Sequence, residues 1–163
     1  MVPSPLKHSS ARVLEFDQFR GLLSAYVNSP LGKERVAELV PSADRNWIDN
    51  QQQLAAETRR FLSAGGRFDF FGLFDAGQLL AKAKIPGAAL EINELRDILL
   101  VADKAAEWRE IALRPPEAVL REKAWEGMQA LSLQIADFTP LLRYFRNKIL
   151  PDGTLDDRAS PEL

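Results

Sequence analysis

The stretch LEINELRDILLVADKAAEWREIAL, residues 90–113, decides the fold because it carries the clearest helical pattern in the chain. Its apolar residues recur at intervals of three and four, the spacing that puts side chains on one face of an α-helix. The members of this face are Ile92, Leu95, Leu99, Ala102 and Ala106. Ile85-Pro86-Gly87 precedes the stretch and Arg114-Pro115-Pro116 follows it, and both interrupt helices. The pattern therefore predicts one long helix over 90–113.

Outward from this helix, the same kind of pattern predicts further helices between short turns rich in proline and glycine. Ser29 and Asp44 suit N-cap positions, because their side-chain oxygens can accept from free backbone N–H groups. Pro30 suits a first helical position, and Gly65-Gly66 suits a helix end. The other predicted helices span 11–27, 30–40, 44–64, 75–84, 117–135 and 137–150.

No convincing strand pattern is present, so the predicted fold class is all-α: a bundle of six or seven helices. Residues 67–74 (RFDFFGLF) lack a helical period, and we expect a loop that places its aromatic rings in the core. From this pattern we expect three segments along the chain. Residues 1–10 form a flexible lead, 11–150 a helical core domain, and 151–163 a turn with the start of a truncated helix.

An apolar stripe runs along the predicted helix over 44–64. Trp47, Leu54 and Phe61 repeat every seven residues, which suits packing against another helix. This stripe leaves open a second interpretation of the whole chain, a stand-alone helical adaptor that docks a partner helix in a groove.

Composition excludes few classes of protein. The chain has 163 residues, 46% of them hydrophobic, and a formal net charge of −2, so charge alone predicts no partner. It contains no cysteine, which excludes disulfides and is compatible with a reducing cytoplasm. No apolar run approaches the roughly 20 residues that span a bilayer. We therefore expect a cytoplasmic protein without a membrane partner.

Known catalytic and metal-binding patterns are missing. Gly32-Lys33 is followed by Glu34 where a phosphate-binding loop needs Ser or Thr, so it indicates an ordinary first helical turn. His8 is the single histidine and lies in the lead segment. Asp152, Asp156 and Asp157 match no calcium-loop spacing. The sequence predicts no catalytic, cofactor-binding or metal-binding residues.

Arg143, Arg146 and Lys148 are the candidate nucleic-acid contact. Cations on one face of a helix can neutralise phosphates, and Arg143 and Arg146 are three residues apart. Acidic residues are as numerous as basic ones in the chain, so a solvated helix face is the other interpretation of this group.

The segment ILPDGTLDDRASPEL, Ile149 to Leu163, combines a turn signal with a helix start. Pro151-Asp152-Gly153 is typical of a turn. Ser160 suits an N-cap, Pro161 the first helical position and Glu162 the positive end of the helix dipole. A helix that starts two residues before the last one predicts that the chain is a segment of a longer protein.

Three segments together resemble the N-terminal part of the bacterial MutS-like family, in the branch that lacks the mismatch-reading domain and carries a C-terminal Smr nuclease domain. They are LEFDQFRGLLSAYVNSPLGKERVAEL (14–39), PGAALEINELRDILLVADKAAEW (86–108) and ILPDGTLDDRASPEL (149–163). The last is the most specific, since it resembles the signature that precedes the family's long lever helix. The resemblance extends over nearly all of 11–163.

The resemblance implies a dimeric, DNA-interacting ATPase, whose core and lever helices connect a DNA clamp to a C-terminal ATPase. Members are linked to suppression of recombination and to stalled ribosomes. The present chain would be a core segment without catalytic residues, since none of the family's catalytic motifs falls in it. ATP, Mg²⁺ and the nuclease would belong to the missing C-terminal part. DNA, the ribosome and a second copy would be partners of the full-length protein.

Overall fold

The computed structural model describes residues 15–120, 125–150, 154–156 and 159. Within them the fold is all-α, as predicted, with an isolated antiparallel bridge between Ile149 and Leu155 and no extended strand. The helices are α2 (Phe16–Ser24), α3 (Pro30–Ala37), α4 (Arg45–Ser63), α5 (Gly77–Ala83), α6 (Ile92–Leu113), the one-turn α7 (Glu117–Leu120), α8 (Glu126–Ser132) and α9 (Thr139–Phe145).

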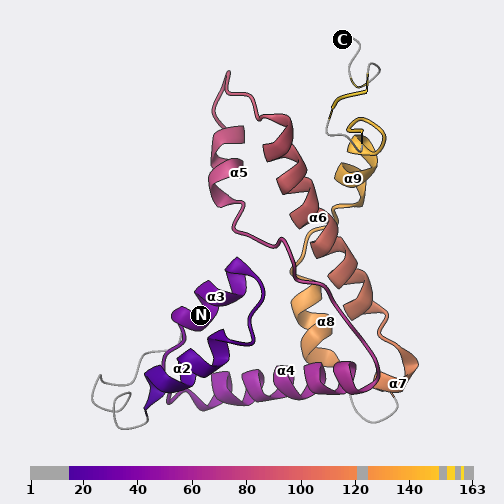
Figure 1. Ribbon diagram of the computed structural model, residues 1–163. Helices are drawn as coiled ribbons and strands as arrows, with labels where there is room; N and C mark the ends of the chain where they lie inside the picture. Colours follow the sequence, from indigo (N-terminus) through magenta and orange to yellow (C-terminus); the bar gives the residue numbers. More distant parts are fainter. Residues whose placement is uncertain (1–14, 121–124, 151–153, 157–158, 160–163) are drawn as a thin grey trace.

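Two long helices organise the molecule. Helix α6 stands across α4, and α8 lies in the angle between them and packs on both (Figure 1). Helices α5 and α9 lie on either side of the N-terminal half of α6, while α2 and α3 form a hairpin near the N-terminal end of α4 (Figure 1). The α4–α6–α8 junction therefore joins the two ends of the described structure.

The buried core lies at this junction. Phe61, Val119, Trp125 and Met128 form one cluster, and Leu54, Ala64, Trp108 and Ile111 pack against it from half-buried positions. The ring of Phe61 meets Trp108 edge-on, with 6.0 Å between ring centroids, and it lies the same distance from Trp125. Tilted and edge-on rings at this spacing attract one another beyond the area that they bury. The aromatic side chains thus hold α4, α6 and the start of α8 together.

A buried carboxylate joins α4 to α8. Glu57 is 1% exposed, and its two oxygens accept from the backbone N–H groups of Gly127, at 3.1 Å, and Met128, at 2.7 Å. The first N–H groups of a helix have no partner within the helix, so a side chain must satisfy them when they are buried. Gln53 donates a further bond to Glu57 at 3.0 Å.

The predicted helix caps are confirmed. Ser29 Oγ accepts from the backbone N–H of Gly32 and Asp44 Oδ1 from that of Trp47, each at 3.1 Å. Pro30 occupies the first position of α3, which makes Gly32 and Lys33 ordinary first-turn residues. Gly65 has a φ of +84°, a conformation that glycine adopts without a steric penalty, and it ends α4 as expected.

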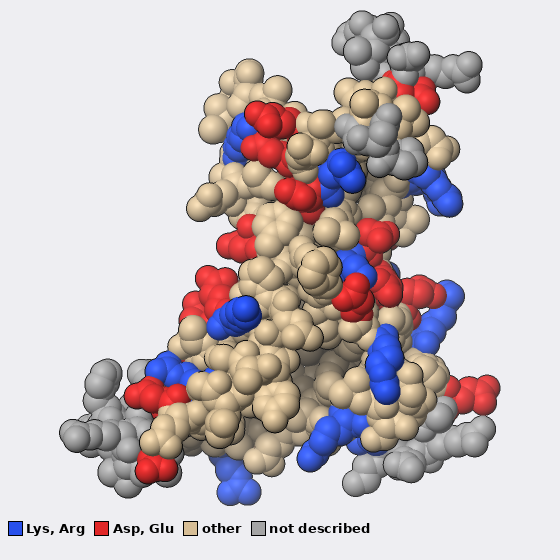
Figure 2. Space-filling model, viewed as in Figure 1, with Lys and Arg blue, Asp and Glu red and all other residues tan. Residues whose placement is uncertain are grey.

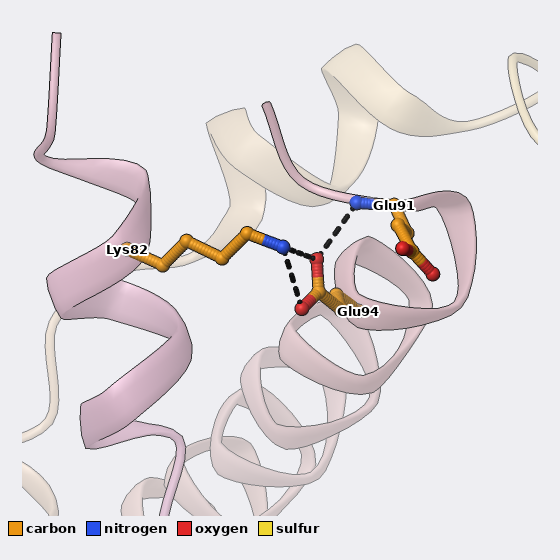
Figure 3. A network of polar contacts seen from close by, with 3 residues as sticks. All are labelled: Lys82, Glu91 and Glu94. Atoms are coloured by element: carbon orange, nitrogen blue, oxygen red, sulfur yellow. Dashed lines mark hydrogen bonds and ion pairs between the residues drawn. The ribbon is translucent and has the colours of Figure 1, made fainter. Parts of the chain in front are cut away.

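An ion pair ties α5 to α6 (Figure 3). The Lys82 ammonium donates to both carboxylate oxygens of Glu94, at 2.8 and 2.6 Å, and Glu94 also accepts from the backbone N–H of Glu91 at 2.8 Å. The bond from Lys82 first, and then that from Glu91, lowers the pKa of Glu94 below its ordinary value.

The prediction of one helix over 117–135 was wrong. Helix α7 ends at Leu120, and α8 starts only at Glu126 with Trp125 as its N-cap residue, outside the helix. The interruption lets the Trp125 ring enter the core while Glu57 satisfies the new helix start. Residues 121–124 lie outside the described part.

Two other predicted helices are shorter than expected. The helix predicted over 137–150 ends at Phe145, since Asn147 has a φ of +69° and Ile149 pairs with Leu155. The helix predicted over 11–27 is described only from Phe16 to Ser24, after Glu15 at a φ of +50°. The predicted lead (1–10) and most of the predicted turn and helix start (151–163) lie outside the described residues.

The loop over 67–74 agrees in part with the expectation. Phe68 and Phe70 contact Trp108, with 5.2 and 6.5 Å between ring centroids. Phe71, however, is 77% exposed. The half-buried Phe68 therefore extends the core along α6, whereas Phe70, which is 50% exposed, and Phe71 remain largely at the surface.

Candidate nucleic-acid interface

A groove runs between the N-terminal half of α6 and the whole of α9. Its volume is about 970 Å³. Its charged and polar lining consists of Asn93, Arg96, Asp97, Asp103, Thr139, Arg143, Arg146 and Asn147. Its apolar lining consists of Leu99, Leu100, Leu142, Phe145 and Ile149.

Two of the three candidate nucleic-acid contacts line this groove. Arg143 lies in the last turn of α9 and Arg146 is the C-cap residue, so the two arginines border the groove although α9 ends between them. Lys148 is not in the lining. Its ammonium lies 3.7 Å from the centroid of the Tyr144 ring, where a cation is attracted by the face of the ring.

The structure adds a third arginine to the group. Arg96 of α6 lines the same groove, 47 positions before Arg143 in the chain. Sequence periodicity could not bring the two together, because it describes one helix at a time and says nothing about which helices pack. The packing of α9 on α6 creates this group.

Charges of both signs border the groove. The lining includes three arginines (Arg96, Arg143 and Arg146) and two aspartates (Asp97 and Asp103), which gives a net charge of +1. All five side chains are exposed. None of them takes part in a hydrogen bond or ion pair between described residues. Figure 2 likewise shows acidic and basic side chains interspersed over the visible face, without a continuous basic surface.

Asp137 fixes the start of α9. Its side chain accepts from the backbone N–H of Thr139 at 2.9 Å. Bonds from Thr139, together with the positive charges of Arg109 and Arg143, lower the pKa of Asp137. This bond satisfies a backbone N–H at the start of α9, which has no partner within the helix.

The heptad stripe on α4 has a graded environment. Phe61 is 4% exposed within the core, Leu54 packs against the same cluster from a half-buried position, and Trp47 is half-buried near the other end of α4. The chain's own helices thus cover one end of the stripe more fully than the other.

No group of three or more potential metal ligands occurs among the residues that the structure describes. Asp152 and Asp157 of the acidic cluster near the end, and His8, lie outside those residues. Within the same ranges, no helix combines the length and the apolar character that crossing a membrane requires.

Similarity to known proteins extends over almost the whole chain. A protein named Endonuclease MutS2 from Aquifex aeolicus is 27% identical over 92% of the chain, and the chain covers 18% of that relative. Proteins of the same name from Halalkalibacterium halodurans and Thermomicrobium roseum are each 30% identical over 93% of the chain, with 19% of the relative covered. No protein-family model matches the chain, and no solved structure matches it. The chain spans about one-fifth of the length of these relatives.

Proposed function

Since the chain is related over nearly its whole length to the Endonuclease MutS2 proteins, we propose that it is a non-catalytic, helical coupling region of a MutS-like, DNA-binding ATPase. In the full-length protein it links the DNA clamp to the ATPase. The observation that carries this proposal is the buried junction of α4, α6 and α8, which aromatic rings and the carboxylate of Glu57 hold together.

The geometry of the junction supports a mechanical role. At 1.5 Å per residue, α4 and α6 are rods of roughly 28 and 33 Å. They are held at one point by the rings of Phe61, Trp108 and Trp125 and by the hydrogen bonds of Glu57 to α8. A displacement at one end of either rod therefore moves its other end, as coupling between distant sites requires.

Catalysis belongs to other parts of the protein in this proposal. ATP and Mg²⁺ would bind outside the present chain, as would the nuclease centre. DNA and the second copy of a homodimer would bind mainly to other regions. Action on stalled ribosomes or on recombination intermediates, and a cytoplasmic location, are functions and properties of the full-length protein.

The purified chain tests the non-catalytic part of the proposal. We expect no ATP hydrolysis, no nicking of supercoiled plasmid and only weak binding to a labelled DNA duplex. Duplex binding is measured at low and at near-physiological salt, because phosphate contacts make affinity fall steeply with salt. Tight, salt-sensitive binding by the chain alone would contradict the proposal, as would either activity.

The gene offers a second test. A reading frame that continues beyond Leu163 into a long helix and a G-x-x-x-x-G-K-[ST] motif supports the ATPase proposal. A stop codon directly after Leu163 removes the ATPase and the nuclease, and favours the helical adaptor instead.

One observation favours that adaptor as the second candidate. Large apolar side chains remain at the surface of the described residues, among them Leu22 at 67%, Tyr26 at 85% and Phe71 at 77% exposure. Exposed apolar groups that gather into patches are typical of sites that other protein surfaces cover. Trp47, at the less covered end of the stripe on α4, would belong to such a docking surface.

A further inference from the structure

We propose that the groove between α6 and α9 binds an amphipathic α-helix that carries carboxylates along one edge of its apolar stripe and ammonium or guanidinium groups along the other. The inference uses only the lining of the groove. It therefore holds or fails independently of the relationship to the MutS2 proteins and of the coupling role.

The apolar lining and the volume suit a helix. Leu99 of α6 and Leu142, Phe145 and Ile149 from α9 and its continuation are half-buried, so each presents apolar surface that a ligand can still cover. Two turns of helix occupy roughly 850 Å³ as a cylinder of 10 Å diameter. The groove has about 970 Å³, which is enough for that length.

The two sides of the groove differ in charge. The α9 side provides only cations, Arg143 and Arg146, while the α6 side provides Asp97 and Asp103 with one cation, Arg96. None of these groups is engaged in an ion pair between described residues, and all five side chains are exposed. A helix with acids facing α9 and bases facing α6 complements both sides at once.

A nucleic acid fits the same lining less well. Phosphates would gain from the three arginines, but Asp97 and Asp103 lie in the same groove and repel them. The aromatic ring in the groove, Phe145, already contacts Tyr144 edge-on, with 5.0 Å between ring centroids. The apolar floor of leucine and isoleucine side chains offers a phosphate backbone no hydrogen bond. The observations therefore favour a helix over a nucleic-acid strand.

The test uses two labelled synthetic helices of about 18 residues, or five turns. Both have a leucine stripe; the first carries Glu on one edge and Lys on the other, and the second carries Lys on both. Fluorescence anisotropy with the 163-residue chain should show binding of the first peptide and about tenfold weaker binding of the second, because its extra lysines face Arg143 and Arg146.

Charge reversal makes the test specific. In the variant R143E/R146E we expect the first peptide to bind about tenfold more weakly and the second about tenfold more tightly than they bind the unmodified chain. The matched control R35E/R59E changes two exposed arginines outside the groove and should leave both affinities unchanged. Circular dichroism confirms that each variant keeps its helical content.

Three outcomes would overturn the proposal. One is that neither peptide binds at about 1 mM, a concentration that reveals even weak association. Another is that R143E/R146E leaves the peptide preference unchanged. The last is that a 20-base-pair DNA duplex binds more tightly than the first peptide and loses this binding in R143E/R146E, which would assign the groove to nucleic acid.

Discussion

The carboxylate of Glu57 on α4 accepts a 2.7 Å hydrogen bond from the backbone N–H of Met128 in the first turn of α8. The two residues are 71 positions apart in the chain, and both are buried. The negative charge lies where the dipole of α8 is positive, so hydrogen bonding and helix electrostatics favour the same arrangement. This contact fixes α8 between the two long helices and makes the junction sensitive to one side chain.

We expect Glu57→Gln to lower the free energy of unfolding by about 1–3 kcal/mol, because an amide provides one acceptor oxygen where the carboxylate provides two. Glu57→Ala should cost about 3–5 kcal/mol, since it leaves buried N–H groups without partners and opens a cavity. Urea denaturation measures both values. The control Glu34→Gln, at an exposed position of α3, should change stability by less than about 0.5 kcal/mol. Equal effects at the two positions would contradict the assigned role of Glu57.

Gly127 allows α8 to approach α4 closely. A Cβ at this position would lie 2.9 Å from Leu54 Cδ2 and 3.1 Å from Glu57 Oε2, and the second of these atoms is held in place by the hydrogen bond from Met128. We expect Gly127→Ala to destabilise the chain by about 1–2 kcal/mol, although alanine favours helix.

Gly21→Ala is the matched control for this substitution. Gly21 lies in α2, and a Cβ there would have no neighbour within 4 Å. We expect this change to stabilise the chain by up to about 1 kcal/mol through helix propensity alone. Thermal or urea unfolding of the two variants should therefore give shifts of opposite sign. Stabilisation by both would mean that the contact between α8 and α4 is looser than the structure indicates.

Local features of the fold could be predicted from the sequence, while the groove could not. Ser29, Asp44 and Gly65 act on backbone groups within a few residues, so their residue types alone indicate where helices begin or end. Arg96 and Arg143 line the same groove only because α6 and α9 pack together. The helical period of a sequence carries no information about which helices pack.

The interruption before α8 shows the same limit. The apolar pattern over 117–135 is compatible with one helix, but burial of Trp125 and the satisfaction of the α8 N-terminus by Glu57 favour two. A tertiary contact thus overrides a helical preference that is weak at any single position. The signal that sequence reasoning missed was Gly127, a residue that weakens a helix interior and permits close approach.

The ion pair between Lys82 and Glu94 predicts how stability depends on pH. The contact lowers the pKa of Glu94 in the folded state. Glu94 therefore contributes stability that is fully present above its ordinary pKa of 4.5 and is lost as the pH falls through the lower, folded-state pKa. Replacing Lys82 removes the hydrogen bond that contributes most to the lowered pKa of Glu94. We therefore expect the pKa of Glu94, followed by carboxyl NMR, to rise toward its ordinary value in Lys82→Met.

Lys84→Met is the control for that titration. Lys84 is the exposed C-cap residue of α5, and its side chain has no ion pair with any described residue. Its replacement should leave the pKa of Glu94 in place, and acid unfolding below about pH 4.5 should follow the unmodified chain. If both lysine variants shifted the titration equally, the cause would be the general loss of positive charge rather than the contact with Lys82.

Trp125 satisfies a carbonyl that the helix itself leaves free. The C=O of Ala112, near the end of α6, would bond to the N–H four residues on, but that residue is Pro116, which has none. Trp125 Nε1 donates to it instead, at 2.8 Å, and both residues are buried.

Trp125→Phe keeps an aromatic ring but removes this donor. We therefore expect a loss of about 2–3 kcal/mol in the free energy of unfolding, from the unsatisfied carbonyl and the smaller ring. Trp47→Phe, at a half-buried site outside the core cluster, should cost less than about 1 kcal/mol in the same urea titration. A similar cost at both sites would mean that packing, and not the hydrogen bond to Ala112, accounts for the role of Trp125.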